Sequence, residues 1–364
     1  MIDTHRPLRN SARSGEVIGI CQVRTFIHRL KPVRGQRVQA VLLEMIDGAV
    51  TPRFSSVDRP ELRPGHVRVA VRAASVNRAD LLIRAGTHTS AGSVDAPSVA
   101  GLDACGEVVE VGPDVGGINI GDRVMAMVPG GLAEEVVVPA AAVVPVPSVW
   151  SFSEGAAAIT ALMTEHNALV TAARLQPGET VLVHAAASGV ATQAIALARV
   201  LGAGRVFGTT RSHSHSPVLR ELGLDELIDV SETNFADRIL ELTDGSGVDV
   251  IIDHVGGPYL GDNLRAAAVK ARIIGVGRLG GATGTLDMEE LARKRVELIG
   301  VTFRTRSDEE KSAIVQALRQ VDLEARADAL RPLIHRIYPW GRVLEAQEEL
   351  AANQHVGKIV LEVR

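Results

Sequence analysis

The feature that most constrains the fold is a regular alternation of short apolar strands and helical stretches between Thr180 and Val301. Residues 181–185 form a near-continuous apolar run, typical of a strand buried on both faces, and residues 189–201 follow with apolar positions at helical spacing. Because crossovers between such units are right-handed, the alternation predicts an α/β segment with a doubly wound parallel sheet. The further strands are predicted at 205–209, 227–230, 248–253, 272–276 and 296–301, and the further helices at 217–222, 235–242, 260–269 and 288–294.

The preceding part of the chain has a different texture. Residues 67–72 alternate apolar and polar side chains, as a half-buried strand does. More short runs follow at 105–112, 121–124 and 134–138, each bounded by Gly or Pro. Short strands with this punctuation predict a small β-barrel or sandwich. A helix at 308–318 and a strand at 358–363 are predicted near the C-terminus.

Residues 1–37 carry a charge opposite to that of the remaining chain. They hold eight Lys/Arg and two acids, whereas residues 38–364 hold 31 Lys/Arg and 41 acids. Such an asymmetry marks a boundary. We weigh three interpretations, in this order: translation that begins near Val38, a flexible basic arm, and an Arg-rich transit peptide.

Charge and composition exclude several classes of protein. The net charge of −4 gives no general attraction to nucleic acid or anionic membranes, and 3% aromatic residues do not supply a stacking surface for single strands. Two cysteines are too few for a disulfide framework. There is no charge-free apolar run of about 18 residues, and no secretory signal is visible. These observations predict a cytoplasmic protein, and we further expect a homodimer.

The first strand-to-helix turn of the alternating segment carries small residues where a dinucleotide fold needs them. Its positions for the tight turn, the approach to the pyrophosphate and the helix–strand contact hold Ala186, Ser188 and Ala191, with Gly189 and Val190 beginning the helix. No plain G-x-G pattern is present, so an ordinary turn rich in small residues is the alternative. The buried strand before it and the helix N-terminus after it favour a dinucleotide phosphate site.

The end of the next strand indicates which dinucleotide would bind. An NAD site places an acid there, but this chain reads Gly208-Thr209-Thr210-Arg211-Ser212. Arg211 can pair with a 2′-phosphate, and Ser212 can add a donor, so we predict NADPH as the cofactor. His213 and His215 either add donors or lie on the surface.

The joint spacing of several motifs resembles the medium-chain dehydrogenase/reductase superfamily, in its zinc-free quinone oxidoreductase branch related to zeta-crystallin. The resemblance spans about residues 39–364. It implies a GroES-like catalytic domain (38–162 plus 303–364) interrupted by a Rossmann NADP-binding domain (163–302). The segments that carry it are 74–80 (ASVNRAD), 100–106 (AGLDACG), 121–124 (GDRV), 183–190, 253–257 (DHVGG) and 355–361 (HVGKIVL).

The same resemblance implies that no metal is bound. Zinc enzymes of the superfamily place a Cys where Asn77 stands and a His-Glu pair where Leu102-Asp103 stands. The four-cysteine lobe is absent as well, since the chain contains only Cys21 and Cys105. Without a Lewis acid, the substrate must already be electrophilic, as a quinone or an activated enone is.

The resemblance also assigns the candidate site residues. Asn77 matches a cofactor- and substrate-facing Asn, and it can equally cap the next helix. Thr164 matches the Thr beneath the nicotinamide, but Glu165-His166 follow it where the family has Ala-Tyr, and His88 replaces a second Tyr. Either histidine can donate a proton near neutral pH or lie on the surface. Residues expected to contact the cofactor are Val255, Gly256, Gly275, Val276, Gly277, Phe303 and Lys358.

These observations lead to one preferred function and two alternatives. The preferred function is an NADPH-dependent reductase that transfers a hydride to a quinone or activated enone, with Asn77, Thr164, His88 and His166 as catalytic candidates. An enoyl-thioester reductase shares the fold and also lacks zinc. A non-catalytic NADPH-binding protein, structural or nucleic-acid-binding, is left open by the basic residues 1–37.

Overall fold

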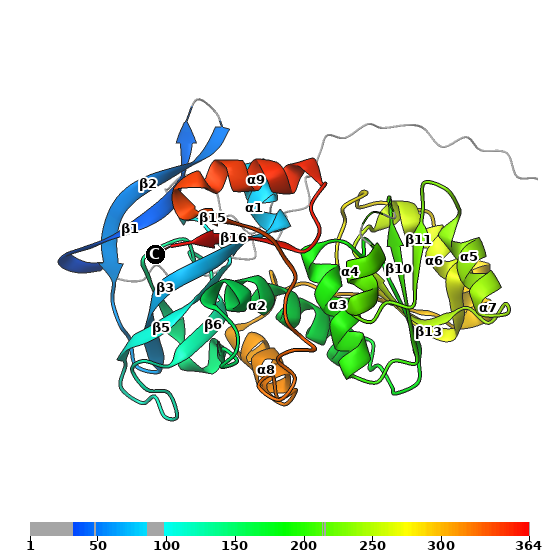
Figure 1. Cartoon of the computed structure of the whole chain (residues 1–364), viewed down its shortest axis with the longest axis horizontal. Coiled ribbons are helices and arrows are strands. Elements are labelled where there is room, and N and C mark those ends of the chain that lie inside the picture. The colour runs from blue at the N-terminus through cyan, green and yellow to red at the C-terminus, as the bar shows by residue number, and fades with distance from the viewer. Residues whose placement is uncertain (1–31, 47–48, 86–97, 213, 215, 364) are drawn as a thin grey trace, which may run out of the picture.

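The computed structural model describes residues 32–46, 49–85, 98–212, 214 and 216–363, which form three sheets and the helices around them (Figure 1). The mixed α/β class predicted from the sequence is confirmed. Residues 1–31, His88, His213 and His215 lie outside the described residues. Residues 32–37 of the basic N-terminal segment belong to the strand β1 (Pro32–Ile46).

The six-stranded sheet on the right of Figure 1 is parallel throughout, with the order β11-β10-β9-β12-β13-β14. The chain moves outward from β9 in one direction and then crosses over to β12, so the strand order reverses between these two strands. Ligands bind at such a reversal, beyond the carboxyl ends of the strands. The bounds are β9 (Thr180–Val183), β10 (Arg205–Thr210), β11 (Glu226–Asp229), β12 (Val248–Asp253), β13 (Ala267–Gly275), β14 (Glu297–Gly300), α3 (Gly189–Val200), α4 (Ser216–Glu221), α5 (Phe235–Leu242), α6 (Leu260–Ala266) and α7 (Met288–Lys294).

One of the helices predicted between the strands of this sheet is too long. The helix expected over residues 260–269 ends at Ala266, and Ala267 already has extended backbone angles and pairs with Val248. Three consecutive alanines are typical of a helix, but pairing with the neighbouring buried strand overrides that preference. Lys270 then adopts a left-handed φ of 68°, and the register between β12 and β13 shifts close to it.

The seven-stranded sheet combines segments from both ends of the sequence. Its order is β15-β16-β3-β5-β6-β8, and β7 pairs with β3. Strand β16, which is close to the C-terminus, runs antiparallel to β3, and the two lie side by side in Figure 1. The smaller sheet has the order β2-β1-β4. The bounds are β2 (Ala49–Pro60), β3 (His66–Val76), β4 (Ser98–Val99), β5 (Asp103–Val111), β6 (Arg123–Met127), β7 (Glu135–Pro139), β8 (Val143–Pro145), β15 (Ile334–Pro339) and β16 (Lys358–Glu362).

Helix α2 (Phe152–His166) lies between the two larger sheets and packs against α3 on one side and β3 and β5 on the other (Figure 1). Ser151 and Glu154 close a capping box at its start. Residues 156–158 are fully buried alanines, which let the neighbouring elements approach closely. The helix then continues into a π-helical turn, Asn167–Ala172. The domain boundary expected between residues 162 and 163 falls inside α2, one turn before the helix ends.

Three other helices lie near the seven-stranded sheet. Helix α1 (Arg78–Arg84) begins directly after β3, with Asn77 as its N-cap, and α9 (Val343–Ala352) packs against it. Helix α8 (Asp308–Arg319) packs against α2.

Candidate active site

The turn between β9 and α3 has the geometry of an anion site. Ser188 caps α3, and its hydroxyl accepts a hydrogen bond from the Ala191 amide at 3.3 Å. Ala186 is fully buried behind the turn. A Cβ added to Gly208 would lie 2.8 Å from the Cβ of Ala186. The N–H groups of Gly189 and Val190 are the first of the helix and have no acceptor within it, so together with the helix dipole they favour an anion.

The segment before β16 closes on this turn at Gly189. A Cβ added to Gly189 would lie 2.5 Å from Cδ of Lys358 and 2.8 Å from the carbonyl oxygen of Gly357. The Gly357 amide donates a hydrogen bond of 2.9 Å to the carbonyl of Ala187. These contacts leave room only for glycine at position 189 and bring the stem of Lys358 against the first residue of α3.

A cavity of about 210 Å³ lies where the two larger sheets face each other. We call it the cleft. Eight of the predicted site residues line it: Asn77, Thr164, Ser188, Gly189, Val190, Val276, Gly277 and Lys358. The other lining residues are Val76, Arg78, His254, Leu279, Leu350, His355, Gly357 and Ile359. The structure therefore brings together Asn77 and Lys358, which are 281 positions apart in the sequence.

The remaining predicted residues lie around the cleft or away from it. The amides of Val255 and Gly256 each donate a 2.8 Å hydrogen bond to Oδ1 of Asp253, which fixes the loop after β12. Gly275 ends β13, and Phe303 packs against the large core that includes α2 and α3. Arg211 and Ser212 are exposed just beyond the end of β10.

His166 does not share the wall of the cleft with Thr164. It follows Thr164 by two residues on α2, which turns its side chain to another face of the helix. It is buried, and burial lowers its pKa to about 4. A histidine in this environment is neutral at physiological pH, so the structure does not support it as a proton donor at the cleft.

Asn77 is the centre of a buried polar network. Its Nδ2 donates to Oδ2 of Asp103 at 2.8 Å and to the Ser75 carbonyl at 3.2 Å, so both amide hydrogens have acceptors. Its Oδ1 accepts a 2.7 Å hydrogen bond from Nζ of Lys358. Asp103 is fully buried and also accepts hydrogen bonds from Ser75 and Thr160. The network fixes the orientation of the Asn77 amide and holds the Lys358 ammonium beside the cleft.

This geometry changes the roles expected for Asn77 and Thr164. As catalytic candidates, both side chains could donate to a reduced substrate oxygen, but the hydrogens of Asn77 are engaged, and the Thr164 hydroxyl donates to the Thr160 carbonyl at 2.7 Å. Lys358 bonds Asn77 and, at 3.4 Å, the Val76 carbonyl, and an ammonium has three hydrogens. The cleft therefore offers an ammonium donor and the lone pairs of Thr164.

The charges of this network depend on one another. The pKa of Asp80 is raised to about 7, mainly by burial and also by the Asp103 carboxylate, while the Asn77 amide and Lys358 oppose the rise. Burial lowers the pKa of Lys358, and Asp103 and Asp80 oppose that change. The carboxyl groups of Asp103 and Asp80 therefore balance the charge of the buried Lys358 ammonium at the cleft wall.

Arg78 is a site residue that sequence reasoning missed. It begins α1 directly after Asn77, lines the cleft, and has a pKa lowered first by burial and then by the charge of Arg211. Arg78 and Lys358 therefore place two cations in the lining that also contains the first residues of α3, and Arg211 lies near enough to Arg78 to affect its pKa. The signal was available in the segment Ala74–Asp80, where a basic residue follows the site Asn.

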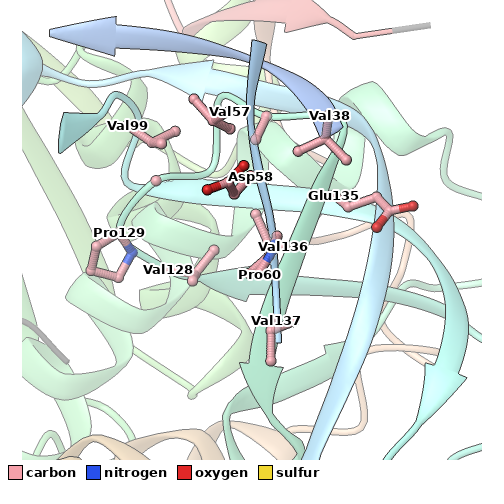
Figure 2. A pocket seen from close by; sticks show the side chains of 12 residues that line it. Val38, Val57, Asp58, Pro60, Val99, Val128, Pro129, Glu135, Val136 and Val137 are labelled. Carbon is pink, nitrogen blue, oxygen red and sulfur yellow. The ribbon is translucent and has the colours of Figure 1, made fainter. Parts of the chain in front are cut away.

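A second cavity, of about 220 Å³, lies between the β1–β2 hairpin and β7 and is shown in Figure 2. Valine and proline side chains surround Asp58 there, including Val57, Val136 and Pro129. Asp58 pairs with Arg37 at 2.8 Å, and the other carboxylate of the lining, Glu135, pairs with Arg59 at 2.6 Å. Because its carboxylates are paired and its wall is otherwise aliphatic, this cavity lacks the features of a catalytic site that the cleft has.

The described residues contain neither a cluster suited to a metal ion nor a helix suited to cross a membrane. No group of three or more His, Cys, Asp or Glu side chains among them is arranged to hold a metal ion. Within the same residues, none of the helices has the length and apolar character needed to cross a bilayer.

Comparisons with known proteins agree with this geometry. Residues 63–148 match the family described as alcohol dehydrogenase GroES-like domain, and residues 189–319 match the zinc-binding dehydrogenase family. A quinone oxidoreductase-like protein 2 homolog from Nematostella vectensis is 30% identical over 99% of this chain and 97% of its own length. The polyketide synthase GfsB of Streptomyces halstedii is 34% identical over 83% of this chain, which spans only 5% of that protein.

Solved structures give the same result. The mycobacterial protein Rv1454c in complex with NADPH is 28% identical, with a TM-score of 0.77 over 89% of this chain and 99% of that one. The CurK enoyl reductase is 27% identical, with a TM-score of 0.76 over 90% of this chain and 99% of that one. With a GroES-like sheet, a parallel nucleotide-type sheet and a relative matched along nearly its whole length, the chain belongs to the medium-chain dehydrogenase/reductase superfamily of oxidoreductases.

Proposed function

We propose that this protein is a reductase that transfers a hydride from NADPH to a quinone or an activated enone without a metal ion. The observation that carries the proposal is the cleft, whose two ends differ in chemistry. One end has the N-terminus of α3 and the cations Arg78 and Lys358, and Arg211 lies near enough to Arg78 to affect its pKa. The other end is lined by Thr164, Val276 and Gly277, which is a mostly apolar surface for a planar ring.

The cationic end fits a diphosphate. Lys358 and Gly357 pack against Gly189, the first residue of α3. A phosphate at this helix N-terminus would therefore lie beside the Lys358 ammonium. Asn77 acts here as a positioning residue, because its Oδ1 holds Nζ of Lys358 and its amide is itself fixed by Asp103. Charge-assisted contacts of this kind are about twice as strong as neutral hydrogen bonds.

The preference for NADPH rests on the end of β10. Arg211 is exposed there and is close enough to Arg78 to affect its pKa, so both guanidinium groups contribute positive potential where the adenosine ribose would lie. The sequence from Gly208 to Ser212 has no carboxylate to accept a ribose 2′-hydroxyl. A 2′-phosphate fits this environment better than a hydroxyl does.

The residues at the apolar end bind and orient rather than activate. Bound NADPH would supply the hydride, and Thr164 would contact its ring with oxygen lone pairs, since the hydroxyl hydrogen is given to Thr160. The proton of the reduced oxygen would not come from His166, because this side chain is neutral and turned away from the cleft. Where zinc relatives have ligands, Asn77 and Asp103 instead hydrogen-bond each other. That donor set supports a metal-free mechanism.

A screen of substrates tests this proposal. Oxidation of NADPH would be followed with a set of quinones, enones and enoyl thioesters, in parallel for the wild type and for Thr164→Val, which keeps the shape and removes the oxygen. We expect turnover with a quinone or enone. No turnover with any member of the set would favour a protein that binds NADPH without catalysis.

The second candidate function is enoyl-thioester reduction. It is favoured by the similarity to the CurK enoyl reductase and by the 34% identity to a segment of a polyketide synthase. In the same screen, turnover restricted to the thioesters would select this alternative over quinone or enone reduction.

A further inference from the structure

A buried histidine–carboxylate pair forms part of the cleft wall. His254 follows the last residue of β12, and Glu165 lies in the last turn of α2, next to Thr164. Nε2 of His254 lies 3.0 Å from Oε1 of Glu165. The Glu165 side chain is 0% exposed, whereas that of His254 is 6% exposed and lines the cleft. The histidine therefore separates the carboxylate from the cleft.

The hydrogen-bond partners of His254 determine how many protons the pair holds. Its Nδ1 lies 2.8 Å from the His184 carbonyl oxygen, which can only accept, so Nδ1 carries a hydrogen. The contact between Nε2 and Glu165 needs one more proton, on the ring or on the carboxyl group. With that proton on the more basic imidazole, the pair is an imidazolium beside a carboxylate.

The neighbouring groups favour this charged form. Burial alone would lower the pKa of His254, but the charge and hydrogen bond of Glu165 and the His184 carbonyl outweigh it, and the pKa is raised. From β12, Asp253 adds negative charge, although its oxygens accept from Val255, Gly256 and Asn263. After β9, His184 bonds Thr209 and Asn263, and burial lowers its pKa, so it is neutral and adds no competing charge.

The orientation of the pair gives the cleft an electrical polarity. The positive ring borders the cavity, and the negative carboxylate lies behind it in the protein interior. An oxidised nicotinamide carries a positive charge, whereas the reduced dihydronicotinamide is neutral. A cation at the wall repels the first and has little effect on the second, and the low dielectric of a buried site strengthens this difference.

We propose that Glu165 holds His254 as an imidazolium at the cleft wall, so that the site binds NADPH in preference to NADP⁺. The inference rests on the proposed function, since it requires the nicotinamide to enter this cleft. Its consequence is directional: the cofactor is held in the form that donates hydride, and the oxidised product is released more readily. Glu165 is a positioning residue in this account, and it stands where the family pattern has an alanine.

The binding test compares two ligands on two variants. Dissociation constants of NADPH and NADP⁺ would be measured by calorimetry at neutral pH for the wild type, Glu165→Gln and Glu179→Gln. Glu179 is a control, because it is a part-buried carboxylate directly before β9 that pairs with Arg272 instead. In Glu165→Gln the amide leaves His254 neutral. The ratio of the NADP⁺ to the NADPH dissociation constant should then fall about three- to tenfold, and it should stay unchanged in the control.

A spectroscopic measurement reports the charge of the His254 ring in the wild type directly. In ¹⁵N-histidine-labelled protein, the ring resonances lost in His254→Gln are those of His254, and both nitrogens should show the shifts of a protonated imidazolium. A neutral ring in the wild type, or an unchanged ratio of dissociation constants in Glu165→Gln, would overturn the inference while leaving NADPH binding intact. Failure of the wild type to bind either nucleotide would overturn the inference and the proposed function together.

Discussion

Replacing Gly189 with alanine should damage cofactor binding far more than a single methyl group would elsewhere. The new Cβ would lie 2.5 Å from Cδ of Lys358 and 2.8 Å from the Gly357 carbonyl oxygen. Neither atom is the free end of a flexible side chain, because Lys358 is buried and Gly357 is backbone held to Ala187. The strain therefore falls on the segment that keeps the Lys358 ammonium beside the helix N-terminus.

The size of the effect follows from two terms. Overpacking a close-packed site costs about 1–3 kcal/mol of folding free energy. If the segment relieves this strain by moving, the contact between Lys358 and a phosphate is lost. That loss costs about 1.5–3 kcal/mol of binding free energy, or roughly tenfold to a hundredfold in affinity. The strain lowers the folding stability and the lost contact lowers the affinity for NADPH, and both arise at position 189.

The assay is a titration of NADPH fluorescence, with thermal unfolding measured in parallel. Gly261→Ala is a matched control, since this glycine also lies in the first turn of a helix and its added Cβ would find its nearest atom 4.0 Å away. We expect Gly261→Ala to bind NADPH as the wild type does. Equal NADPH affinity of Gly189→Ala and Gly261→Ala would refute the role given to the contacts of Gly189 with Lys358 and Gly357.

Three further predictions follow from the site and its surroundings. Arg211→Ala should weaken NADPH binding roughly tenfold to a hundredfold and leave NADH binding nearly unchanged; an equal loss for both would mean that Arg211 does not contact the 2′-phosphate. Because the pKa of His166 is lowered to about 4 in the folded state, its neutral form adds stability above the unfolded pKa that is lost as the pH falls from about 6.5 toward 4. His166→Phe should therefore flatten the decline of Tm over that range, and a decline as steep as that of the wild type would exclude this origin. Turnover should survive prolonged treatment with a chelator, whereas one zinc per chain whose removal abolishes activity would contradict the metal-free proposal.

The parallel sheet was predictable because its signals are local. Apolar runs such as residues 181–185 and the small residues around Gly189 specify a strand, a tight turn and a helix within about twenty positions. The start of β13 was missed for the opposite reason. Ala267 becomes a strand residue through its pairing with Val248, nineteen positions earlier, and its own alanine-rich surroundings favour a helix.

The site shows the same division between local and long-range information. The positions of Asn77, Thr164 and Lys358 at the cleft followed from motifs. Their hydrogen bonds did not, because Asn77 gives its amide hydrogens to Asp103 and Ser75 and accepts from Lys358, 281 positions away. The pair of Glu165 and His254 is separated by 89 positions. Nothing in either local sequence indicates that a carboxylate and a histidine will share a proton there.

A crystal structure of the protein with NADPH would test the central claim most directly. The account predicts the diphosphate at the N–H groups of Gly189 and Val190, the 2′-phosphate near Arg211, and the dihydronicotinamide ring between Thr164 and His254. A nucleotide bound outside the cleft would contradict the account. So would a ring that lies farther than a hydrogen bond and one water from Asn77, Thr164, His254 and Lys358.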